Sequence, residues 1–318
     1  MVAPHVVLLG PQRIEPTLKD AVASLGIHGR VAAVTAGWEE REAEDQEMRD
    51  HLGIRVVNLR VYERGEDIYQ RDPELFGAMR ERHDLLRKLQ ELYRVRLAHE
   101  LAAGRELLRR GTPQGFEALM GPVVEEALEA LRALDRQHLE RIAAIHAEFD
   151  ARWRPTERES VARHRAELKA QLVGCEALCV AGGHVTILLN RVRLLGLLEL
   201  ARGLPVIAWS AGAMVLSPRI VLFHDSPPQG FGNPEVLEAG LAAFPGVVAL
   251  PHADRRLRLE DPARVAIFAR RFLPDRCAVL VQGARLDWDG RTWVGTNGTR
   301  RLGEDGTLVD VGVQEVGV

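Results

Sequence analysis

The sequence is poor in cysteine and in aromatic residues, and it lacks a long apolar run. Its three cysteines, Cys175, Cys179 and Cys277, do not make an even disulfide framework, which favours a reducing compartment. No stretch approaches the roughly 20 apolar residues that a membrane helix needs. The first five residues, Met-Val-Ala-Pro-His, lack the basic start and apolar run of a secretory signal. We therefore expect a cytoplasmic protein without a membrane partner.

A surplus of charge is also absent. The sequence has 42 Lys and Arg residues against 45 Asp and Glu residues, a net charge of -3, which gives no reason to expect nucleic acid as a partner. The 11 histidines are scattered, and none shows metal-ligand spacing with a carboxylate. We expect neither a metal nor another cofactor. With 318 residues, of which 46% are hydrophobic, the chain can bury a substantial core.

Residues 1–72 alternate between short apolar runs and segments with helical spacing. Strands are expected at residues 6–9, 31–34 and 54–59, and helices at residues 17–25 and 39–52. Strands that are apolar throughout have no wet face, so they imply a mostly parallel sheet covered by helices on both faces. The segment is predicted to be the first part of an α/β domain.

Residues 73–173 differ in character, because leucines recur there at helical spacing among interleaved charges of both signs. Breaks are expected at residues 111–113, 121–122 and 154–155, which predicts three or four helices. We interpret the segment as a large all-helical insertion. It is either a solvated hairpin or small bundle, or else an arm through which the chain forms a homo-oligomer, or a lid.

Residues 174–318 return to alternating strands and helices and form the second part of the α/β domain. Strands are expected at residues 177–181, 205–209, 219–223, 246–250 and 278–281, and helices at residues 185–201 and 261–272. The Asp-Gly and Asn-Gly pairs at residues 289–290, 297–298 and 305–306 predict C-terminal β-hairpins.

Reactive side chains follow several of these predicted strands. Ligands of parallel α/β sheets bind at the carboxyl ends of the strands. Ser210 lies between a strand and a helix among small residues, which suits a tight turn that pushes its hydroxyl outward. His252 is the best-placed base, and the N–H groups of Ala211 and Gly183 can face a tetrahedral oxyanion. These residues predict a nucleophilic serine whose histidine partner is distant in the chain and meets it at one rim of the sheet.

Taken in order, the motifs resemble a known family. They are Ala-Gly-Gly-His at residues 181–184, Ala-Trp-Ser-Ala-Gly-Ala at 208–213, Phe-His-Asp at 223–225 and Leu-Pro-His at 250–252. They resemble the aspartyl dipeptidase and cyanophycinase family of serine peptidases over roughly residues 176–283. The resemblance implies a class I glutamine amidotransferase-like, flavodoxin-like fold. It also implies that Ser210 is the nucleophile, His252 the general base, and Gly183 and Ala211 the oxyanion hole.

The sequence departs from the family pattern at the third triad position, where the family has a glutamate. The matching turn here carries Gln282, which can accept a hydrogen bond from the imidazole but cannot stabilise an imidazolium with a full charge. Replacing the orienting aspartate of a serine protease by its amide lowers turnover by ~10⁴. Asp254, two residues after His252, is the alternative partner. A further departure is His184, which stands in place of the family's asparagine.

Residues His184, Asp225 and Asp254 are candidate substrate contacts. His184 serves either that role or the start of the following helix, and Asp225 either lines the pocket or caps the following turn. Two functions remain open. The chain is a serine hydrolase of a small peptide or related amide substrate, acting through an acyl-enzyme at Ser210, or it is a catalytically silent relative that serves as a binding or assembly module. A glutamate in place of Gln282 is expected to raise the activity of an enzyme and to leave a silent relative unchanged.

Overall fold

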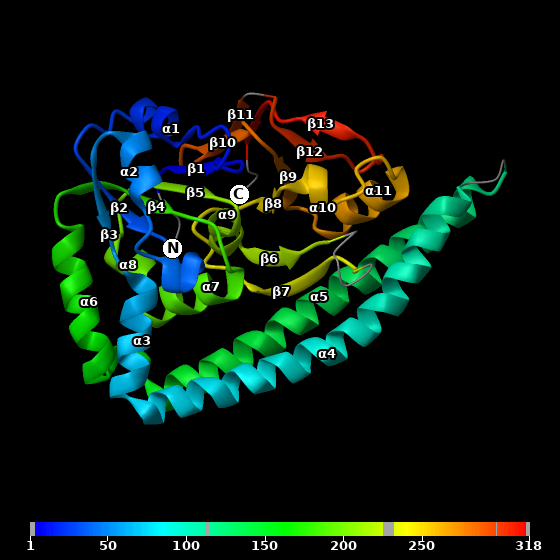
Figure 1. The fold of residues 1–318 in the computed structure, drawn as a ribbon. Coiled ribbons are helices and arrows are strands. Elements are labelled where there is room, and N and C mark those ends of the chain that lie inside the picture. Colours follow the sequence, from blue (N-terminus) through cyan, green and yellow to red (C-terminus); the bar gives the residue numbers. More distant parts are fainter. Residues whose placement is uncertain (1–3, 112–114, 225–231, 297, 316–318) are drawn as a thin grey trace.

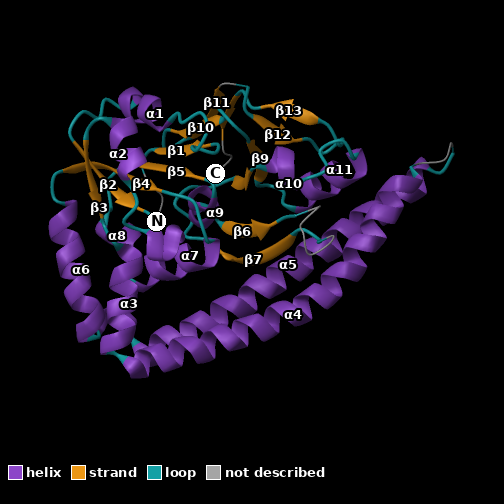
Figure 2. Ribbon diagram, viewed as in Figure 1, coloured by secondary structure: helices purple, strands orange, loops and turns teal. Residues whose placement is uncertain are grey.

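The computed structural model of the chain describes residues 4–111, 115–224, 232–296 and 298–315. Within them a central sheet with helices on both sides lies next to a smaller sheet, and a long pair of helices runs along one side of the molecule (Figures 1 and 2). This arrangement confirms the predicted α/β fold with a helical insertion and C-terminal hairpins.

The central sheet has eight strands in the order β14-β11-β10-β1-β5-β4-β2-β3. Its parallel strands are β1 (Val6–Leu9), β2 (Arg30–Val34), β3 (Arg55–Asn58), β4 (Cys175–Val180) and β5 (Val206–Trp209). Its antiparallel extension is β10 (Arg285–Trp288), β11 (Thr292–Thr296) and β14 (Val313–Glu315). The five parallel strands place their carboxyl ends at one rim, which is where the candidate site is found.

The alternation of side chains along β1 shows how the sheet is covered. Val7 and Leu9 belong to a core formed with the helices α1 (Leu18–Ser24) and α2 (Gln46–Leu52). The intervening side chains, Val6 and Leu8, belong to the larger core on the other face. Because successive side chains of a strand point to opposite faces, a run that is apolar at every position requires both faces to be buried.

Two further sheets separate from the central one. The first has the order β13-β12-β9-β8, from β8 (Val247–Pro251), β9 (Arg276–Leu280), β12 (Arg300–Leu302) and β13 (Leu308–Asp310). The second is the antiparallel pair β6 (Arg219–Leu222) and β7 (Glu235–Ala239). The expectation that His252 follows a strand of the same sheet as Ser210 is therefore wrong, because β8 pairs in parallel with β9 in the smaller sheet.

The remaining helices connect and cover these sheets. They are α3 (Val61–Arg71), α4 (Pro73–Arg110), α5 (Glu117–Trp153), α6 (Glu159–Leu172), α7 (Val185–Leu194), α8 (Leu197–Leu200), α9 (Ala211–Leu216), α10 (Ala253–Arg256) and α11 (Pro262–Arg271), with the 3₁₀ helices η1 (Ala36–Arg41) and η2 (Pro155–Glu157). None of the helices in the described part of the chain combines the length and the apolar character needed to span a bilayer.

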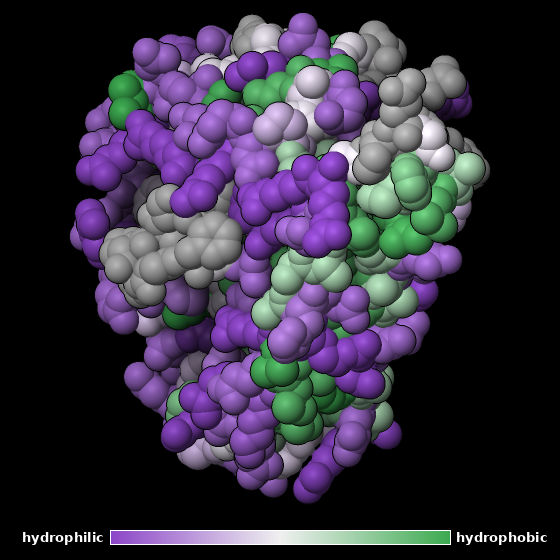
Figure 3. Space-filling view, turned by 90° about the vertical axis from the view of Figure 1, so that its right-hand side faces the viewer, coloured by the Kyte–Doolittle hydropathy of each residue, from purple (hydrophilic) through white to green (hydrophobic). Residues whose placement is uncertain are grey.

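Helices α4 and α5 form an antiparallel pair that passes beside β6 and β7 and extends beyond α11 (Figure 1). Asp72 caps α4 by accepting a hydrogen bond from the N–H of Leu75, and it also pairs with Arg158 at the start of α6. The end of the molecule at which this hairpin turns has a mixed hydrophilic and hydrophobic surface (Figure 3). Phe116 and Leu119, near that turn, are both largely exposed.

Three predicted boundaries are wrong. The break expected at residues 121–122 is absent, because α5 continues through Pro122. A proline this close to a helix start removes a single hydrogen bond, and the packed turns that follow outweigh the loss. The helix expected at residues 39–52 is interrupted by a turn that buries Glu42 and Asp45, and the one expected at residues 185–201 breaks at Gly196, which has a φ of 56°.

Candidate active site

Ser210 sits on a sharp turn between β5 and α9. Its φ of 52° and ψ of -125° are unfavourable for any residue with a side chain, so the turn is a point of backbone strain. Small neighbours make this turn possible. A Cβ atom on Gly212 would lie 2.2 Å from the carbonyl oxygen of Val180, and one on Gly182 would lie 2.6 Å from Cβ of Ser210. The glycines therefore let β4 and the start of α9 approach the serine closely.

His252 follows β8 and reaches the same place from the smaller sheet. Helix α9 packs against both β5 and β8, which brings the ends of these two strands together. The N–H of His252 donates to the carbonyl of Leu280 at 3.1 Å, which ties the residue to the end of β9. The result is a contact of 3.2 Å between Oγ of Ser210 and Nε2 of His252. The two side chains, 42 positions apart in the sequence, are within hydrogen-bonding distance.

The turn after β4 lies directly beside Ser210. Gly183 has a φ of +114°, and a Cβ atom there would lie 2.1 Å from the carbonyl oxygen of Gly37, so no other residue fits at this position. Ala211 is the first residue of α9, and its N–H therefore has no acceptor within the helix. Both residues belong to turns at Ser210, and their role as an oxyanion hole stays a prediction from the sequence.

Gln282 and Asp254 both line a cavity of about 390 Å³ beside His252. Gln282 does not bond to the imidazole. Its amide nitrogen instead donates to the carbonyls of Pro11, at 3.2 Å, and Glu15, at 2.9 Å. Asp254 is exposed in the first turn of α10. Among the described residues, Nδ1 of His252 has no hydrogen-bond partner, so neither candidate orients the ring through a hydrogen bond here.

Of the other two candidate substrate contacts, His184 and Asp225, only the first lies among the described residues. His184 is the N-cap of α7, where its Nδ1 accepts the N–H of Ile187 at 3.3 Å, and its side chain is exposed. It thus starts the helix, and it directly follows the turn at Gly182 and Gly183. Asp225 lies outside the described residues.

The surroundings of His252 favour its neutral form. Partial burial lowers the pKa of the imidazole from the ordinary 6.5, and the positive charges of Arg256 and Arg255 lower it further. Asp254 acts in the opposite direction and raises the pKa. A neutral imidazole can accept a proton from a hydroxyl, so the pKa shift suits a general base at neutral pH. Within the described ranges, no cluster of three or more His, Cys, Asp or Glu side chains could hold a metal ion.

Two features of the site were not found from the sequence. Gly37 holds the turn at Gly182 and Gly183 by contact and by accepting the N–H of His184 at 2.7 Å, but a lone glycine after a predicted strand gives no such signal. Arg256 gives no signal in the sequence either, because its effect on the pKa of His252 depends on the turn of α10.

The structure thus has an α/β fold with a serine on a strand-to-helix turn and a histidine within hydrogen-bonding distance of it. Residues 132–288 match the sequence model of peptidase family S51. The matched region, just under half of the chain, contains Ser210, His252 and Gln282. The family resemblance drawn from the motifs is thus confirmed. No curated protein matches the chain.

Two solved structures are similar to the chain. A peptidase from an acI-B1 Actinobacterium aligns over 99% of this chain and 98% of its own, with 12% sequence identity and a TM-score of 0.49. A putative peptidase E protein from Listeria monocytogenes EGD-e aligns over 43% of this chain and 65% of its own, with 19% identity and a TM-score of 0.30.

Proposed function

We propose that the protein is a serine hydrolase that cleaves a peptide or related amide bond through an acyl-enzyme at Ser210. The contact of 3.2 Å between Oγ of Ser210 and Nε2 of His252 supports this most directly. A serine hydroxyl needs a base to become a nucleophile, and these two groups come from different sheets to meet at a strained turn. The match of residues 132–288 to a peptidase family supports the same function.

In the proposed reaction, Nε2 of His252 takes the hydroxyl proton as Oγ of Ser210 attacks the scissile carbonyl carbon. The negative charge on the carbonyl oxygen is stabilised by the N–H groups of Gly183 and Ala211. The imidazolium then gives its proton to the leaving amine, and the acyl-enzyme forms. Water, activated by the same imidazole, releases the acid and restores the serine.

Labelling with a fluorophosphonate tests the proposal, because this reagent reacts with serines that are activated in this way. We expect a single adduct, located on Ser210 by mass spectrometry, and none in Ser210→Ala. Ser217 is a useful internal comparison, since its hydroxyl is buried and donates to the carbonyl of Ala213. A folded protein that gives no adduct would count decisively against the hydrolase.

The alternative, a catalytically silent relative that binds or assembles, is favoured by one observation. Nδ1 of His252 lacks a hydrogen-bond partner among the described residues, whereas an active triad holds this nitrogen with a carboxylate. A silent relative would keep the fold and the oxyanion turn yet fail to react with the fluorophosphonate. The labelling experiment therefore separates the two functions.

The substitution Gln282→Glu is expected to destabilise the protein and not to raise the labelling rate, contrary to the expectation from the sequence. A carboxylate cannot donate to the carbonyls of Pro11 and Glu15, and it would face both oxygens with a negative charge. We expect a loss of roughly 2 kcal/mol in the free energy of unfolding, measured with urea. Gln282→Met is the matched control, because it removes the hydrogen bonds without adding charge. A faster labelling rate at unchanged stability would instead show that a carboxylate at this position reaches the imidazole.

The pH dependence of labelling is expected to follow the lowered pKa of His252. The base acts only when neutral, so the rate should rise with pH and level off with a midpoint below 6.5. Arg256→Gln removes a charge that lowers the pKa and should move the midpoint up. Asp254→Asn removes the charge that raises the pKa and should move it down. Shifts in the same direction for both variants would exclude His252 as the group that titrates.

A further inference from the structure

Glu39 is a second strained residue at the rim of the sheet. It lies in η1, just after β2, with a φ of 59° and a ψ of -128°. These angles are nearly those of Ser210, which has a φ of 52° and a ψ of -125°. A residue with a side chain adopts this conformation only at a cost in free energy, and such residues cluster where a protein binds or reacts. The sequence reads as an acidic helix here, so the strain is visible only in the structure.

The backbone before Glu39 is held against the oxyanion turn. Gly37 accepts the N–H of His184 at 2.7 Å, and a Cβ atom on Gly37 would lie 2.5 Å from the carbonyl oxygen of Gly182. No sideways movement of this segment is possible without displacing the turn beside Ser210. The strain at Glu39 is therefore fixed from one side by the candidate active site itself.

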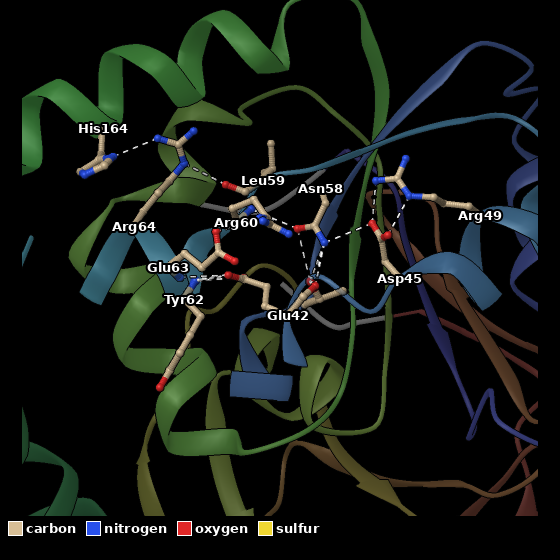
Figure 4. A network of polar contacts seen from close by, with 11 residues as sticks. Glu42, Asp45, Arg49, Asn58, Leu59, Arg60, Tyr62, Glu63, Arg64 and His164 are labelled. Atoms are coloured by element: carbon tan, nitrogen blue, oxygen red, sulfur yellow. Dashed lines mark hydrogen bonds and ion pairs between the residues drawn. The ribbon is translucent and has the colours of Figure 1, made fainter. Parts of the chain in front are cut away.

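The backbone after Glu39 is held by a buried network (Figure 4). The carboxylate of Glu42, which is fully buried, accepts the N–H groups of Tyr62, at 2.9 Å, and Glu63, at 3.0 Å, at the start of α3. The carbonyl of Glu42 accepts hydrogen bonds from Thr35 and Asn58. Burial raises the pKa of the Glu42 carboxyl, because taking its charge out of water costs free energy. The hydrogen bonds of the network offset this cost.

The side chain of Glu39 differs from its acidic neighbours in having no partner. Glu40 accepts from the hydroxyl of Tyr62 at 2.9 Å, and Glu44 pairs with Arg41. Within the described part of the chain, no hydrogen bond or ion pair engages the carboxylate of Glu39, although the residue is half-buried. Neither the strained backbone nor the unpaired charge stabilises the fold, and a glycine would satisfy the backbone better.

The order of the strands sets the distance between Glu39 and the serine. Strand β4 lies between β2 and β5 in the sheet. At the carboxyl ends of these strands, Glu39 follows β2, Gly183 follows β4 and Ser210 follows β5. Neighbouring strands lie roughly 5 Å apart, so Glu39 follows a strand on the order of 10 Å from the one that ends at the serine. A substrate bound at Ser210 that extends past the end of β4 therefore reaches the turn that carries Glu39.

We propose that Glu39 recognises a cationic group of the substrate, so that the hydrolase prefers a peptide or amide with a positive charge close to the scissile bond. This inference rests on the proposed function of Ser210. The cation is either the free α-ammonium group at the amino terminus of the substrate or a basic side chain next to the cleaved bond. Glu39 acts as a specificity-determining residue in both cases, because its carboxylate contacts the substrate and not the reacting atoms.

Two fluorophosphonates that differ only in their tails test this proposal, one ending in an alkyl group and the other in an ammonium group at the same length. We expect the ammonium probe to label the wild-type protein faster by on the order of tenfold, the effect of one hydrogen-bonded charge. In Glu39→Gln the ratio of the two rates should fall to about one. Glu40→Gln is the matched control and should keep the wild-type ratio, because the carboxylate of Glu40 is already engaged by Tyr62.

The variant Glu39→Gly separates recognition from structure. It should lose the preference for the ammonium probe and yet unfold at a higher temperature than the wild type, because glycine adopts these backbone angles without strain. A lower unfolding temperature would overturn the argument from strain. Three aminomethylcoumarin amides then separate the sources of the cation: alanyl, N-acetylalanyl and N-acetyl-lysyl. Preference for the first indicates the α-ammonium, and preference for the third indicates a basic side chain.

The outcomes for the inference and for the proposed function are distinct. Equal labelling of the wild-type protein by the two probes overturns the role of Glu39 and leaves Ser210 as a reactive serine. Absence of labelling by either probe overturns the hydrolase and, with it, the inference. An unchanged ratio in Glu39→Gln assigns the preference to another group and also overturns the role of Glu39.

Discussion

The substitution His252→Gly is expected to reduce the rate of fluorophosphonate labelling at Ser210 by on the order of 10⁴-fold or more, as for the loss of the base from other serine hydrolases. The reason is geometric, because Nε2 lies 3.2 Å from Oγ and no other base contacts this oxygen among the described residues. The fold should not suffer. His252 has a φ of 57° and a ψ of 30°, a left-handed conformation that glycine adopts more readily than histidine.

Added imidazole provides the control for this variant. The lost side chain borders a cavity of about 390 Å³ that opens a path for a small base. Restoration of labelling by imidazole, with a midpoint of thermal unfolding at or above that of the wild type, would assign the loss to the missing base. Labelling at the wild-type rate in His252→Gly would remove the base from the mechanism and leave the reactivity of Ser210 without its stated cause.

The parallel core was predictable because its signal is local. A strand buried on both faces must be apolar at every position, and the runs that became β1, β2, β4 and β5 read in this way without knowledge of their neighbours. The assignment of β8 and β9 to a smaller sheet was not predictable on the same grounds. Their residues are as apolar as those of β4, and the sheet that a strand joins depends on partners far away in the sequence.

The candidate site divides in the same way. Ser210, Gly183 and Ala211 belong to short motifs whose shape follows from small residues, so their arrangement could be predicted. The hydrogen-bond partners of Gln282 could not be predicted, because its amide donates to carbonyls that lie 267 and 271 positions earlier in the chain. The backbone strain at Glu39 could not be predicted for a related reason. It arises from contacts that the flanking residues make with α3 and with the turn after β4.

The helical insertion is joined to the rest of the molecule by a buried ion pair. Arg271 of α11 binds both carboxylate oxygens of Asp135 of α5, each at 2.7 Å, and the two side chains are 1% and 3% exposed. The hydroxyl of Tyr93 of α4 donates to Asp135 at 2.8 Å, accepts from Arg271 at 2.8 Å, and accepts the N–H of Val236 of β7 at 3.1 Å. Four elements thus share one set of hydrogen bonds.

The substitution Asp135→Ala is expected to lower the free energy of unfolding by roughly 3–5 kcal/mol, because it leaves the charge of Arg271 buried and unpaired. Urea unfolding measures the loss, and hydrogen exchange should show α4 and α5 opening before the central sheet. Asp84→Ala is the matched control. It breaks the exposed pair of Asp84 with Arg87 on the same insertion, and it should cost less than about 1 kcal/mol.

The double variant Asp135→Leu with Arg271→Met decides what the buried pair contributes. Two apolar side chains of similar volume remove both charges at once, so most of the stability lost in Asp135→Ala should return. Full recovery would mean that the ion pair does not stabilise the docked insertion beyond what apolar packing achieves, and that its role is to fix the position of α5 against α11. A double variant as unstable as the single one would show that the hydrogen bonds to Tyr93 and to the carbonyl of Pro234 carry the docking. Labelling of Ser210 should be unchanged in every one of these variants that remains folded, because the ion pair lies outside the contacts that join Ser210 to His252.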